Sequence, residues 1–303
     1  MFSNVLIGVD GQSGGRDAIA LAKQLAAPRA RFVLAHICGG NWTPGPFGGG
    51  ITLSVEAADA DQLLAQERDA ASLDAELVAY SAQSFGRGLH EVAERYHADL
   101  LVIGSSRHGL VGRVLMGDQT RASLNGAPCA VAVAPSGYAT SSHALTKLGV
   151  GYDRSAESER ALAAARELAA RRGSAISALS VVSLQRIPVA GGTIPGDYWP
   201  EVVRELSDDE QERMNALDGV HGKAIYGLPG EELARFGDEV DLLIIGSRGY
   251  GPLGRLVHGS TSNHLARHAH CPLLILPRAA SVDEPSPARA DAYGVETTAG
   301  VGN

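Results

Sequence analysis

The sequence is poor in cysteine and aromatic residues and has no long apolar run. Its three cysteines, Cys38, Cys129 and Cys271, form neither a C-x-x-C pair nor an even-numbered framework, so we expect reduced structural thiols rather than disulfides. No run reaches the roughly 20 apolar residues of a membrane span, and residues 1–10 lack the features of a secretory signal. We therefore expect a cytoplasmic protein with no membrane partner.

An excess of basic residues is also missing. The chain has 26 Lys and Arg against 34 Asp and Glu, a formal charge of −8. Because binding to the phosphate backbone depends on Lys and Arg, this balance argues against a nucleic-acid partner. With 303 residues, 45% of them hydrophobic, the chain is long enough for two domains with separate cores.

The chain repeats itself. "ADLLVIGSSRHGLVGRVLMGD" at 98–118 returns as "VDLLIIGSRGYGPLGRLVHGS" at 240–260, and residues 5–26 match 148–169. The offsets between the matching segments are 142 and 143 residues. Two long matches at nearly the same offset indicate a tandem duplication of one domain.

Each copy gives the same order of elements: a strand followed by Asp10 or Asp153, an Ala-rich helix, then strands and helices in alternation. Long helices are expected at 56–79 and 201–217. This alternation predicts two tandem doubly wound domains of the α/β class, each with a five-stranded parallel sheet of the Rossmann type.

We place the domain boundaries where the composition changes. The first domain is expected to cover residues 1–138 and the second 146–278, with 136–147 as the linker and 279–303 as a flexible tail rich in Ala, Pro, Ser and Gly. A Gly/Pro-rich insertion after the second strand of each copy contains Trp42 or Trp199, which either covers a ligand or anchors the loop.

A glycine-rich segment, residues 246–261, follows an apolar strand of the second copy. It lacks the Lys of a Walker A loop. The segment 249–254 fits G-x-G-x-x-G, but no Asp or Glu lies between Asp241 and Asp283, so the acidic residue of a dinucleotide site is missing.

The remaining pattern is Gly246-x2-Gly249-x9-Gly259-Ser260. At these residues, and at the Asp after the first strand, the sequence resembles the universal stress protein family in its tandem two-domain form. The resemblance covers about residues 1–278. It implies an adenine nucleotide α-hydrolase-like fold and ATP, with Mg²⁺ across its phosphates, as the cofactor.

The spacing also has a physical rationale. Glycines let backbone N–H groups approach an anion without a Cβ in the way. The chain returns at Gly259, Ser260 and Thr261, where a helix start offers unpaired N–H groups and small hydroxyls. A triphosphate between these two walls would satisfy both sets of donors.

The resemblance extends the predicted site to further residues. It gives Asp153 a contact to the ribose or adenine and the backbone of Val181 a contact to the adenine edge. It also implies that Ile245, Ser260 and Ser262 border the nucleotide. The glycine spacing and the loop itself place Gly246, Arg248, Gly249, Gly259 and Thr261 near the phosphates. Each residue has a structural alternative, because Asp153 could cap the next helix and residues 259–260 could simply begin one.

The first copy departs from the pattern at two positions, since Arg107 and Asp118 replace Gly and Ser. Arg107 disfavours a positive φ, and the carboxylate of Asp118 would repel phosphate. We expect ATP in the second copy and weak or no binding in the first. The weaker candidates that remain there are Asp10, Ile37, Gly104 and Gly117.

Signals of enzymatic chemistry are few. "GQSGG" at 11–15 fits a nucleophile elbow but follows the first strand, and His264, His268, His270 and Cys271 have no acidic partner for a metal site. Arg248 and Arg255 would allow at most slow ATP hydrolysis, because no general base is evident.

We therefore expect an ATP-binding regulatory protein of the stress response. Two alternatives are a scaffold with little use for nucleotide and a very slow ATPase. The resemblance also implies that the last strands of the two domains pair with each other as a pseudo-dimer, and a homodimer of the whole chain stays open.

Overall fold

The computed structural model describes residues 2–39, 50–105, 118–141, 144–183, 199–247 and 260–277. The first half contains β1 (Phe2–Gly8), α1 (Ser13–Leu25), β2 (Ala26–Gly39), α2 (Gly50–Ala70), β3 (Ala75–Ala82), α3 (Phe85–Arg95), β4 (Leu100–Gly104), α4 (Asp118–Leu124) and β5 (Ala130–Ala134). A 3-10 turn, η1 (Tyr138–Thr140), leads to the second half. The second half contains β6 (Lys147–Gly151), α5 (Ala156–Arg172), β7 (Ala175–Val182), α6 (Trp199–Asn215), β8 (His221–Tyr226), α7 (Pro229–Phe236), η4 (Gly237–Glu239), β9 (Leu242–Gly246), α8 (Ser260–His268) and β10 (Leu273–Leu276).

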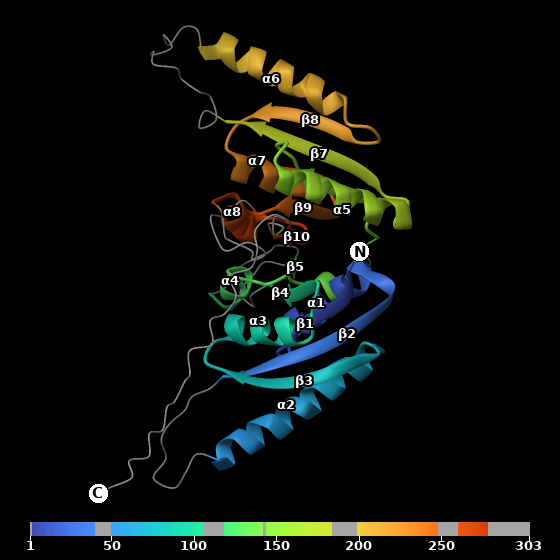
Figure 1. Cartoon of the computed structure of the whole chain (residues 1–303), viewed down its shortest axis with the longest axis vertical. Coiled ribbons are helices and arrows are strands. Elements are labelled where there is room, and N and C mark those ends of the chain that lie inside the picture. The colour runs from blue at the N-terminus through green and yellow to red at the C-terminus, as the bar shows by residue number, and fades with distance from the viewer. Residues whose placement is uncertain are drawn as a thin grey trace, which may run out of the picture.

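The strands of both halves form one sheet that runs along the molecule (Figure 1), in the order β3-β2-β1-β4-β5-β10-β9-β6-β7-β8. Pairing is parallel within each half. β5 and β10 join the halves antiparallel, with Val131 opposite Ile275 and Val133 opposite Leu273. The predicted fold class and the predicted pairing of the two last strands are confirmed.

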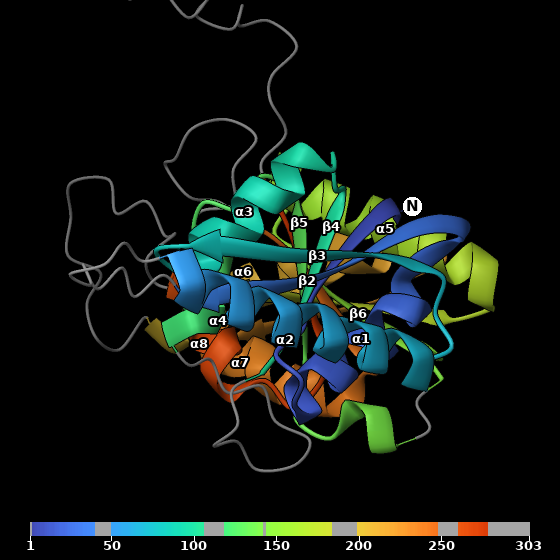
Figure 2. The ribbon, with the colours of Figure 1, turned by 90° about the horizontal axis from the view of Figure 1, so that it is seen from below.

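Helices lie on both faces of this sheet (Figure 2). Buried apolar side chains form one core cluster on each face. One core cluster includes Leu21 of α1, Leu64 of α2, Leu162 of α5 and Met214 of α6. The opposite cluster contains buried residues of α3, α4, α7 and α8. A parallel sheet needs cover on both faces, which explains why its strands are continuously apolar.

The segment that connects the halves is tied down. Asp17 of α1 is 2% exposed, and its carboxylate accepts hydrogen bonds from the backbone N–H groups of Gly137 (2.8 Å) and Ala139 (2.7 Å). Tyr138 between them is buried in the core. The beginning of the predicted linker is thus an ordered turn that packs on the first half.

An aspartate before β4 and one before β9 play equivalent roles in the two halves. Asp241 accepts from Thr146 N–H and Oγ1 (both 2.7 Å) and from Lys147 N–H (2.8 Å). Asp99 accepts from the N–H groups of Ser3 (2.7 Å) and Asn4 (3.1 Å). Each carboxylate fixes the start of the neighbouring strand, β6 or β1.

One predicted element is wrong in its extent. The helix expected over 56–79 ends at Ala70, and residues 75–79 belong to β3. The turn that stops it places Ser72 at φ +47°, while Leu73 N–H bonds back to the carbonyl of Arg68. The turn contains no Gly or Pro, so the Ala-rich sequence gives no sign that the helix ends there, and the predicted helix extends too far. The second long helix, expected over 201–217, ends at Asn215.

Candidate functional site

Each half has one point where the strand order changes direction. In the second half, β7 and β8 lie on one side of β6, while β9 and β10 lie on the other. In open α/β sheets the crevice beyond the carboxyl ends of the strands at such a switch point is the usual place for a ligand. The strand order therefore puts the switch point of the second half between the carboxyl ends of β6 and β9, and that of the first half between those of β1 and β4.

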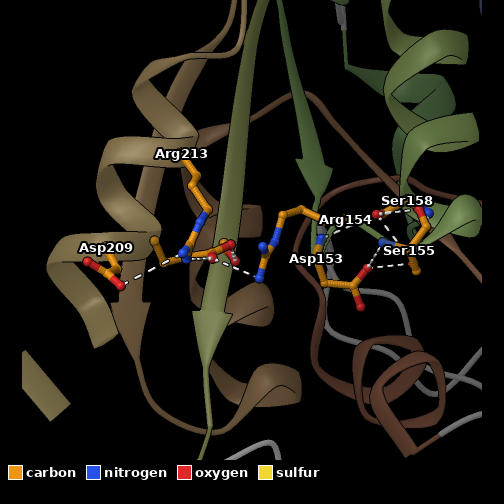
Figure 3. Close-up of polar contacts among 8 residues, drawn as sticks. Asp153, Arg154, Ser155, Ser158, Asp209 and Arg213 are labelled. Atoms are coloured by element: carbon orange, nitrogen blue, oxygen red, sulfur yellow. Dashed lines mark hydrogen bonds and ion pairs between the residues drawn. The ribbon is translucent and has the colours of Figure 1, made fainter. Parts of the chain in front are cut away.

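Asp153 lies at this point of the second half, two residues beyond β6. Figure 3 shows its carboxylate turned toward Ser155, and Asp153 Oδ1 accepts from Ser155 N–H (3.1 Å) and Ser155 Oγ (2.5 Å). Ser155 in turn caps α5 by accepting from the N–H of Ser158 (3.2 Å). The aspartate thus supports the helix start in addition to any contact with a ligand.

Gly246 ends β9 beside the first turn of α5. A Cβ at this position would come within 2.5 Å of the backbone carbon and oxygen of Glu157. Gly104 is in the same situation in the first half, where a Cβ would lie 2.1 Å from the oxygen of Gly14. The first glycine of the pattern is therefore explained by helix packing, so by itself it does not indicate an anion site.

The next backbone amide is already engaged. Ser247 N–H donates to the carbonyl of Leu276 (2.9 Å), as Ser105 N–H donates to Ala134 (2.9 Å) in the first half. Backbone N–H groups that bind an anion beyond the end of β9 must therefore come from residues after Ser247.

The opposite wall begins where the sequence predicted a helix start. α8 starts at Ser260, which is exposed, followed by the partly exposed Thr261 and the buried Ser262. A helix of nine residues has the positive end of its dipole at this end.

Val181 and Ile245 are 8% and 4% exposed, and their side chains belong to the same core cluster. They lie in β7 and β9, on either side of β6. Only their backbone or the rim of their side chains can border a ligand, which agrees with the backbone role that the resemblance implies for Val181.

The first half has the same framework. Asp10 follows β1, and its Oδ1 accepts from Gln12 N–H (3.0 Å) in a turn like that of Asp153. Ile37 is buried in β2, and Gly104 ends β4. Three predicted site residues of the second half, Arg248, Gly249 and Gly259, lie outside the described residues, as do Gly117, Arg107, Trp42, Arg255 and the proposed tail at 279–303.

The sequence does not predict an ion pair next to Asp153, in which a buried glutamate meets two half-exposed arginines. Glu210 of α6 has a side chain only 8% exposed; its Oε1 accepts from Ser180 Oγ (2.8 Å), and its Oε2 lies 3.3 Å from Arg154 Nη2 (Figure 3). Arg213 Nη1 lies 3.5 Å from the same Oε2. A signal was present, since Glu67 and Glu210 are 143 residues apart, the offset that relates Asp10 to Asp153.

The residues that resembled metal ligands have other contacts. The rings of His264 and His268 stack with centroids 4.2 Å apart, and desolvation followed by the charge of His268 lowers the pKa of His264. His270 Nδ1 contacts Asp238, while burial raises the pKa of the Cys271 thiol to about 12. Among the described residues, no three His, Cys, Asp or Glu side chains are grouped to hold a metal ion.

Two other sequence signals have structural explanations. Ser13 of the elbow-like "GQSGG" begins α1, so it occupies a helix entry. Trp199 begins α6 and is partly exposed. Within the part of the chain that the structure describes, no helix has both the length and the apolarity to cross a membrane.

Strand order and repeat together define a class: a tandem α/β protein with one topological switch point in each half. The sequence model of the Universal stress protein family matches residues 1–135 and 145–277, and the chain belongs to this family.

Relatives and solved structures agree with that membership. A universal stress protein of Mycobacterium tuberculosis is 28% identical over 206 residues, covering 64% of this chain and 70% of its own. A second one from that organism is 27% identical over 302 residues, covering 89% and 96%. The crystal structure of a universal stress protein from Archaeoglobus fulgidus covers 91% of this chain and 99% of its own, with a TM-score of 0.64 and 17% identity, and so shares the fold.

Proposed function

We propose that the protein is an ATP-binding regulator of the stress response that holds its nucleotide, with Mg²⁺, in the second half. Binding rather than turnover would carry the signal. The observation that supports this most is positional: Asp153, Val181 and the end of β9 meet around one topological switch point, and α8 begins beyond it.

The residues present fit a nucleotide chemically. Asp153 can accept hydrogen bonds from ribose hydroxyls or from the adenine amine, and the start of α8 offers backbone N–H groups and hydroxyls to phosphate oxygens. Gly249 and Gly259 complete the G-x2-G-x9-G-[ST] spacing in the sequence. Mg²⁺ would sit on the phosphates and keep several waters, as it usually does with nucleotides.

The first half is proposed to bind ATP weakly or not at all. Its helix α4 begins with Asp118 where α8 begins with Ser260. A carboxylate at a helix N-terminus is itself favourable there and competes with a phosphate for the same amides. The domain limits 1–138 and 146–278 and a cytoplasmic location belong to the same proposal.

The test compares two equivalent glycines. Gly259→Val should abolish ATP binding, whereas Gly117→Val, the same position in the first half, should leave affinity unchanged. Purified full-length protein would be titrated with ATP and Mg²⁺ in a calorimeter, and the fold of each variant checked by circular dichroism. Retained affinity in Gly259→Val would refute an ATP site in the second half.

A scaffold that uses little nucleotide is the main alternative. The degraded pattern of the first half favours it, because that half has kept the fold without the glycine spacing. Chromatography of small molecules released by denaturing the freshly purified protein separates the two, since a nucleotide-dependent regulator should release an adenine nucleotide. Slow hydrolysis would show as ADP accumulating in wild type but not in Gly259→Val.

A further inference from the structure

Arg154 has a backbone conformation that arginine rarely adopts. Its φ is +64°, in the left-handed region, and the two other non-glycine residues with positive φ in the described chain, Ser72 and His97, follow the ends of helices. The residue that matches Arg154 in the first half is Gly11, with φ +73°. The turn therefore requires a left-handed residue in both halves, and the second half places a strained side chain there.

The side chain of Arg154 pairs with a buried carboxylate, that of Glu210. Arg154 Nη2 lies 3.3 Å from Oε2 of Glu210, whose side chain is 8% exposed. A buried carboxylate is unfavourable unless a cation and hydrogen bonds accompany it. Two cations accompany Glu210: Arg154, whose own side chain is 55% exposed, and Arg213 of α6, whose Nη1 lies 3.5 Å from the same oxygen. Ser180 supplies a hydrogen bond at 2.8 Å.

The first half meets the same requirement differently. Its buried glutamate, Glu67, is paired with Arg16 of α1, whose Nε lies 3.2 Å from both carboxylate oxygens. The position of Arg16 is taken by Glu159 in the second half, and Glu159 accepts a hydrogen bond from Tyr152 instead. In the second half one of the two cations, Arg154, therefore comes from the turn that carries Asp153, and the other, Arg213, comes from α6. In the first half Arg16 comes from α1.

We propose that Arg154 is a positioning residue for the nucleotide of the second half. Its ion pair with Glu210 ties the turn to α6 and holds Asp153 in the orientation that contacts the nucleoside. This inference rests on the proposed function and adds a residue to it. Strained backbone that its surroundings hold in place is a recurring feature of ligand clamps, because it keeps the binding group preorganised.

The position of Asp153 sets the signature of this role. Asp153 is assigned to the nucleoside end of the ligand, so losing the Arg154 tether should weaken ATP and ADP by the same factor. If Arg154 instead attracted the phosphates, its removal would weaken the binding of ATP more than that of ADP, and this loss of affinity would be smaller at high salt.

The experiment transplants the arrangement of the first half. In full-length Arg154→Gly/Glu159→Arg, glycine adopts the left-handed turn without strain, and an arginine on α5 can pair with Glu210 as Arg16 pairs with Glu67. We expect unfolding stability at or above wild type and affinities for ATP and ADP that both fall by about tenfold. Glu159→Arg alone is the matched control and should bind as wild type.

Two single variants keep the test decisive if the double variant folds poorly. Glu210→Gln retains an oxygen acceptor for Ser180 but loses the charge, and it should weaken ATP and ADP about equally. Arg154→Lys keeps a cation and should retain most of the wild-type affinity for ATP and ADP.

The outcomes are distinct. If wild type binds and both the double variant and Glu210→Gln bind as well as wild type, Arg154 has no positioning role, although ATP binding stands. A loss that is larger for ATP than for ADP also overturns the inference. If wild type binds no adenine nucleotide, the proposed function fails first, and this inference fails with it.

Discussion

The two halves share a framework but differ in residues around the proposed ligand position. Both place an aspartate beyond the first strand, a glycine against the first helix and a buried glutamate on the second helix. They differ in the cations that pair with that glutamate, Arg16 in one half and both Arg154 and Arg213 in the other, and in the residue that begins the helix after the glycine loop. Shared features thus maintain the fold, and the differences lie at the positions where we propose that the two halves differ in binding.

The largest expected effect tests the shared part. Gly246→Ala and Gly104→Ala should each lower the free energy of unfolding by about 2–3 kcal/mol, because the new methyl group would meet helix backbone that cannot rotate away. Urea denaturation of both variants measures this. If Gly246→Ala lost nucleotide affinity but less than about 0.5 kcal/mol of stability, the glycine would serve the ligand rather than the packing.

A second effect concerns the two aspartates. Asp153→Asn keeps an oxygen that can accept from Ser155 but removes the charge, so ATP affinity should fall about tenfold with little change in thermal stability. Asp10→Asn makes the same change in the first half and should leave ATP affinity as it is. Equal losses in both variants would show that the halves bind alike.

The smallest effect concerns the strand anchors and depends on pH. Burial opposes ionisation of Asp241, but hydrogen bonds from Thr146 and Lys147 outweigh it and lower its pKa below 3.8. A carboxyl with a lowered folded pKa stabilises the fold above its unfolded pKa, and that stabilisation disappears as the pH falls through the folded value. Asp241→Asn should therefore cost about 1 kcal/mol at pH 7 and nothing once Asp241 is protonated in both states.

The matched variant is Asp99→Asn, whose carboxylate accepts from two backbone N–H groups instead of three donors. It should cost less than Asp241→Asn in denaturation at pH 7. A loss for Asp241→Asn that did not shrink as the pH falls into the acid range would contradict the role given to its carboxylate.

Sequence reasoning recovered the architecture because the repeat supplied each element twice. It failed where a contact joins distant residues. The packing role of Gly246 is one example, since nothing local shows that Glu157, 89 positions earlier, lies against it. Its place in an anion site stays a prediction. Arg154 and Glu210 are 56 positions apart, and only the folded sheet brings them together. The end of the helix before β3 was missed because a non-glycine residue, Ser72, makes the turn.

The proposed function requires an asymmetry between the halves: the second half should bind ATP and the first should not. Calorimetric titration of the intact wild-type chain, with saturating Mg²⁺, measures it directly. The predicted result is one ATP per chain, released as one equivalent when the protein is denatured. Two equivalents bound with similar affinity, or none at millimolar ATP, would contradict it.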